Sequence, residues 1–107
     1  MTTDDATMRG YQAAHGRPPA LEGSDGRAYS AGVFSEDDPG QDGRYGAALI
    51  FVRWSPTSEP DGHLETGFLV YDADPARAEE VVGQTTLHDV KRHLDQLIAK
   101  RRETEAK

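Results

Sequence analysis

The ten residues from Tyr45 to Trp54 place the strongest constraint on what this chain can fold into. They alternate as a β-strand does, yet apolar side chains fill both alternating sets. One set is Tyr45, Ala47, Leu49 and Phe51, and the other is Ala48, Ile50, Val52 and Trp54. A strand that is apolar on both faces is typical of the centre of a sheet that is covered from both sides. We therefore expect this segment to be the central strand.

Three further strands are predicted around it. Residues 20–22 and 27–34 form a hairpin, because the Asp25-Gly26 pair between them is a favoured hairpin turn in which glycine takes a positive φ. The segment 63–71 alternates more openly and is the last strand. Polar, turn-rich segments at 35–44 and 55–62 are expected to be loops.

Two helices follow the strands. Asp74 and Pro75 are a typical N-cap and first helical residue, and Gly83 is expected to end that helix. Thr86 begins the last helix, whose apolar residues fall on one stripe. That stripe consists of Leu87, Val90, Leu94, Leu97 and Ile98.

The order of elements predicts an α+β fold. We expect a four-stranded antiparallel meander backed by a C-terminal amphipathic helix, in the order ββββαα, because the links between strands are too short for parallel crossovers. Residues 18–107 form this single domain. Residues 1–17 are either a weakly ordered arm or a short helix that begins near Thr3 and ends at Gly16.

Charge and composition exclude several classes of function. The absence of cysteine excludes disulfides, thiolate catalysis and cysteine-based metal sites, and it favours the cytoplasm. No apolar run is long enough for a membrane span, and we expect no membrane association. The net charge of −7 argues against nucleic-acid binding. The counter-signal is the basic C-terminal segment with Lys100, Arg101, Arg102 and Lys107.

Few residues suggest chemistry. His63 and Glu65 share one face of a strand and are a candidate acid–base pair, although no third orienting group is apparent. His88 and His93 are five residues apart, which is unsuitable for one metal on a helix. The acidic segment 36–42 lacks the ligand spacing of a calcium loop. We therefore expect no catalytic residues, no metal and no cofactor.

The second face of the sheet is where we expect function. One strong amphipathic helix covers only one face of a strand that is apolar on both, so the other face is left for a protein partner or for a second copy in a homodimer. The candidate residues of this surface are Tyr45, Leu49, Phe51, Leu69 and Tyr71. The alternative cover is the N-terminal segment, through Met8 and Tyr11.

Three functions remain open from the sequence. The leading hypothesis is a non-enzymatic protein-interaction or regulatory module. The second is a small-molecule-binding domain or enzyme that uses His63 and Glu65. The third is an antitoxin-like nucleic-acid regulator that uses the basic C-terminal helix.

Overall fold

The computed structural model describes residues 6–105, which form five strands and three helices. The predicted helix start at Thr3, and Lys107, lie outside these residues. In chain order the elements are α1 (Met8–His15), β1 (Ala20–Glu22), β2 (Ala28–Ser35), β3 (Tyr45–Trp54), β4 (Pro60–Glu65), β5 (Val70–Asp72), α2 (Pro75–Gly83) and α3 (Leu87–Glu105).

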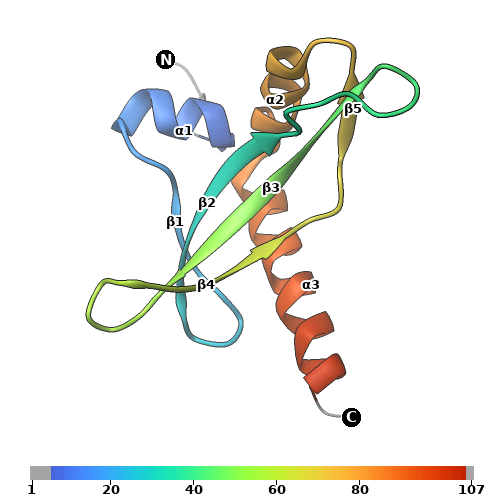
Figure 1. Cartoon of the computed structure of the whole chain (residues 1–107). Coiled ribbons are helices and arrows are strands. Elements are labelled where there is room, and N and C mark those ends of the chain that lie inside the picture. Colours follow the sequence, from blue (N-terminus) through green and yellow to red (C-terminus); the bar gives the residue numbers. More distant parts are fainter. Residues whose placement is uncertain (1–5, 106–107) are drawn as a thin grey trace.

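The strands form one antiparallel sheet with β3 at its centre. Its order is β1-β2-β3-β4, and β5 pairs with β3 on the same side as β4. In Figure 1, β3 runs diagonally across the view between β2 and β4, and α3 passes behind it. The predicted class, a single α+β domain with an antiparallel meander and a C-terminal helix, is confirmed, and so is the central position of β3.

The predicted helix starts are also confirmed. The side chain of Asp74 accepts a hydrogen bond from the amide of Ala76 at 2.9 Å, and Pro75 is the first residue of α2. The hydroxyl of Thr86 accepts a hydrogen bond from the amide of Asp89 at 3.2 Å just before α3. Each cap satisfies a backbone amide that would otherwise lack a partner in the first turn.

The N-terminal segment forms a short helix that docks on the domain. Thr7 caps α1 through a hydrogen bond from the amide of Gly10, and Gly16 ends it in the left-handed conformation with φ 68°. The amide of Met8 donates to the carbonyl of Thr85 at 2.9 Å, and the Met8 side chain is buried in the core. Met8 therefore completes the core on the helix side of the sheet.

The core lies between one face of the sheet and the helices. From the sheet it takes alternate residues of β2 and β3, with Leu49 and Phe51 fully buried. From α3 it takes Val90, Leu94 and Ile98 of the predicted stripe. The stripe packs on the sheet because every third or fourth residue of a helix returns to the same side.

The last predicted strand is interrupted. Glu65 of β4 pairs with Ile50, whereas Val70 of β5 pairs with Ala47, so the chain contains two extra residues between the two pairings. In addition, β4 already begins at Pro60, inside the segment that was expected to be a loop. The insertion moves Phe68 away from the core: its ring lies against Gly46, on the face of β3 opposite to Leu49 and Phe51.

Candidate functional site

The face of the sheet turned away from α2 and α3 is an uncharged apolar surface. Its residues in β2 and β3, hereafter the open face, are Ala28, Ser30, Gly32, Phe34, Gly46, Ala48, Ile50, Val52 and Trp54. Most of them are partly exposed, whereas Gly46 and Ala48 are buried. None of these nine positions carries a charged residue, although 29% of the chain is charged. Contiguous apolar area of this kind on a small domain marks an interaction surface.

Aromatic rings extend the open face beyond β2 and β3. The ring of Phe68 lies 6.3 Å from that of Phe34 and 6.0 Å from that of Tyr71, centroid to centroid. The guanidinium of Arg44 lies 5.4 Å from the centre of the Tyr71 ring. Phe68 and Tyr71 remain 39% and 49% exposed. Aromatic side chains with one exposed face are enriched at protein interfaces.

The molecule exposes more surface than a folded chain of its mass normally does. Its dimensions are 43 × 38 × 22 Å, so it is a slab. Its accessible surface is 6800 Å², whereas a compact monomer of this mass exposes about 5,900 Å².

The structure separates the predicted surface residues into two groups. Leu69 and Tyr71 are 40% and 49% exposed, whereas Leu49 and Phe51 are fully buried beneath the helices, so including these two in an exposed surface was wrong. Tyr45 belongs to the same alternating set as Leu49 and is partly buried. A one-residue change of register exchanges the two faces of a strand, which explains the error.

A signal for the correct set was present in the sequence. The open face includes Ser30 and Gly32, and its neighbours on β4 are His63 and Glu65, the Cα partners of Val52 and Ile50. Small and polar residues that share a face indicate the side without helices. Applied to all three strands together, this pattern identifies Ile50, Val52 and Trp54 as the set turned away from the helices, where they are partly exposed.

His63 and Glu65 come together as expected, but in an exposed position. His63 Nε2 lies 3.4 Å from Glu65 Oε2, and the two side chains are 61% and 46% exposed. None of the pockets described below is lined by either residue. An exposed pair of this kind is typical of a surface ion pair.

A small pocket of about 100 Å³ lies between the sheet and the last turns of α3. The hydroxyl of Tyr29 donates to Asp25 at 2.7 Å inside it. Partial burial disfavours the charged form of Asp25, but hydrogen bonds from the Arg27 amide and the Tyr29 hydroxyl outweigh this and lower its pKa. Burial, with Asp25 beside it, raises the pKa of Tyr29. These groups satisfy one another, which suits a structural role.

Arginines complete the lining of that pocket. Arg53 is held by Asp61 at 2.8 Å, and Arg101 and Arg102 approach from α3. The carboxylate of Asp25 offsets part of their charge. The basic C-terminal segment thus has an acidic neighbour within the fold, which weakens its attraction for a phosphate backbone.

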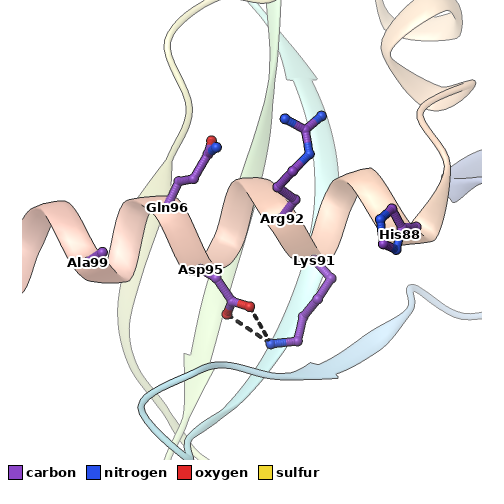
Figure 2. A pocket seen from close by; sticks show the side chains of 6 residues that line it. All are labelled: His88, Lys91, Arg92, Asp95, Gln96 and Ala99. Atoms are coloured by element: carbon purple, nitrogen blue, oxygen red, sulfur yellow. Dashed lines mark hydrogen bonds and ion pairs between the residues drawn. The ribbon is translucent and has the colours of Figure 1, made fainter.

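A second, shallow groove of about 440 Å³ runs along the outer side of α3. Figure 2 shows its six lining residues, which all belong to this one helix: His88, Lys91, Arg92, Asp95, Gln96 and Ala99. Lys91 Nζ lies 2.7 Å from Asp95, whose carboxylate also accepts from the amide of Ser24. Asp95 of this groove therefore links α3 to the β1–β2 hairpin.

Within residues 6–105, no three His, Asp or Glu side chains are grouped so that they could hold a metal ion. Among the described helices, none is long and apolar enough to cross a membrane.

Comparison of the chain with known protein families, with curated proteins and with solved structures finds no match.

Proposed function

We propose that this protein is a non-enzymatic interaction module that binds an apolar protein surface through the open face. The observation that carries the proposal is the run of nine uncharged positions across β2 and β3, in a chain that is otherwise highly charged. Uncharged apolar surface is unfavourable in water, and it is stabilised when a partner removes it from solvent.

The partner's surface is expected to be apolar as well. The ionisable groups of this face lie at its margins: His63 and Glu65 on the β4 side, Glu22 on β1 beside Ala28, and Arg44 beside Tyr71. An apolar centre with a polar rim is the usual anatomy of a protein interface. A small polar ligand would find few hydrogen-bonding groups at the centre of this face.

Site-specific photo-crosslinking tests the proposal. A photoreactive benzoylphenylalanine replaces Val52 on the open face, or Arg92 on the outer side of α3 as the matched control, in the cells that make the protein. We expect protein adducts from position 52 and few from position 92. Absence of adducts at position 52, or equal yields at both positions, would contradict the proposal.

A further inference from the structure

No contact or backbone angle within the chain requires a glycine at position 32. It lies in the middle of β2, and a β-carbon built there would meet only a methyl group of Ile50, at an ordinary 3.5 Å. The glycines of the neighbouring strands differ: Gly46 is pressed by the ring of Phe68, and Gly62 has φ +152°. Glycine weakens a strand interior and often marks a place where another molecule approaches closely.

The residues around Gly32 form a repeated pairing of small with large side chains. Every cross-strand pair on the open face between β2 and β3 joins one of each. These pairs are Ala28 with Trp54, Ser30 with Val52, Gly32 with Ile50, and Phe34 with Ala48. The larger residue is on β3 in the first three pairs. The surface therefore has a low strip along β2 beside a raised strip along β3, over most of its length.

A raised strip beside a parallel low strip is complementary to itself. A two-fold axis that runs between β2 and β3, parallel to the strands, places β3 of each copy over β2 of the other. Ile50 of each copy then lies over Gly32 of the second copy. Reciprocal contacts of this kind define an isologous interface, and alternating large and small residues allow two layers to interdigitate.

On this basis we infer that the occupant of the open face is a second copy of this chain, packed face to face around that axis. The inference rests on the proposed function and identifies its partner. The product is a four-layer sandwich, with two sheets about 10 Å apart inside and the helices outside. The helices of each copy pack on the other face of its sheet, with Leu49 and Phe51, so they stay clear of the second copy.

The charge of the open face is consistent with a second copy. The acidic chains carry a net charge of −7 each, but no charged side chain of β2 or β3 lies on the open face. Repulsion between the remaining charges is screened over about 8 Å at physiological salt.

The test is sedimentation of the full chain between about 5 and 200 μM, a range that covers micromolar dimers. We expect a dimer for the wild type. Gly32→Val fills the low strip and suits a strand, so it should leave the monomer folded and weaken the dimer at least tenfold. Ile50→Glu should do the same by burying a charge. Val81→Glu, on the exposed side of α2, is the control and should leave dimerisation unchanged.

A double variant makes the arrangement specific. Gly32→Val combined with Ile50→Ala exchanges the large and small positions, so the two copies fit again and dimerisation should recover. An unrelated partner would not be rescued in this way. Failure of the double variant to recover dimerisation, with the fold intact by circular dichroism, would overturn the proposed pairing.

Two other outcomes separate this inference from the proposed function. A wild type that stays monomeric at 200 μM while hydroxyl-radical footprinting labels Ile50 and Trp54 would overturn the second copy and leave the open face to another protein. A dimer that Val81→Glu breaks and Ile50→Glu does not would overturn both.

Discussion

The ring of Phe68 lies against the backbone of Gly46, so closely that a β-carbon at position 46 would come within 2.6 Å of Phe68 Cγ. This contact fixes the end of the open face. It is possible because the two-residue insertion between β4 and β5 allows Phe68 to reach over β3.

We expect Gly46→Ala to lower the free energy of unfolding by about 1–3 kcal/mol, the usual range for overpacking a filled site. Gly67→Ala is the matched control, because a β-carbon at position 67 meets nothing within 4 Å. Urea unfolding at one fixed protein concentration measures both. Equal stabilities of the two variants would show that the Phe68 ring does not press on Gly46.

Truncation of Leu94 tests how α3 is held on the sheet. Leu94 is fully buried among core residues from the sheet and α3. Leu94→Ala should destabilise the fold by about 2–5 kcal/mol, as expected for a truncated core leucine. Val81→Ala, at a residue that is 42% exposed, is the control. A loss below about 0.5 kcal/mol for Leu94→Ala would mean that α3 does not dock.

Local signals predicted most of the fold. The bounds of β3, the Asp74 cap and the stripe of α3 follow from alternation, capping chemistry and helical spacing, all of which act within a few residues. The choice of face does not follow from β3 alone, because Leu49 and Ile50 are equally apolar; it needs the small and polar residues on the neighbouring strands. The interruption after Glu65 was also missed, because it depends on a contact between Thr66 and a distant strand.

Acid should remove the contribution that ionised Asp25 makes to the stability of the fold. Its folded-state pKa lies below the usual 3.8, because the hydrogen bonds it accepts outweigh the effect of burial. A lowered pKa stabilises the fold above the unfolded-state value, and this stability is lost as pH falls through the folded-state value. The free energy of unfolding of the wild type should exceed that of Asp25→Asn by a constant amount near neutral pH, and this difference should shrink below about pH 4.

Unfolding curves from neutral pH down to acid check this, with Tyr29→Phe as the second variant. That change removes the hydroxyl that donates to Asp25 at 2.7 Å and should reduce the pH-dependent part. A gap between wild type and Asp25→Asn that stays constant down to the lowest pH would contradict the assignment.

At the interruption between β4 and β5, the side chain of Thr66 supplies a hydrogen bond to β3 that the strand backbone would otherwise make. Its hydroxyl oxygen accepts a hydrogen bond from the amide of the buried Leu49 at 3.0 Å, while its own amide donates to the carbonyl of Leu49. Thr66→Val keeps the shape and the backbone bond but leaves the Leu49 amide without its acceptor. An unsatisfied buried donor costs about 1–3 kcal/mol, so we expect a loss of this size in urea unfolding. Thr66→Ser retains the hydroxyl and should retain most of the stability. If Thr66→Ser is as unstable as Thr66→Val, the lost methyl group rather than the hydrogen bond is responsible, and the side chain does not complete the ladder.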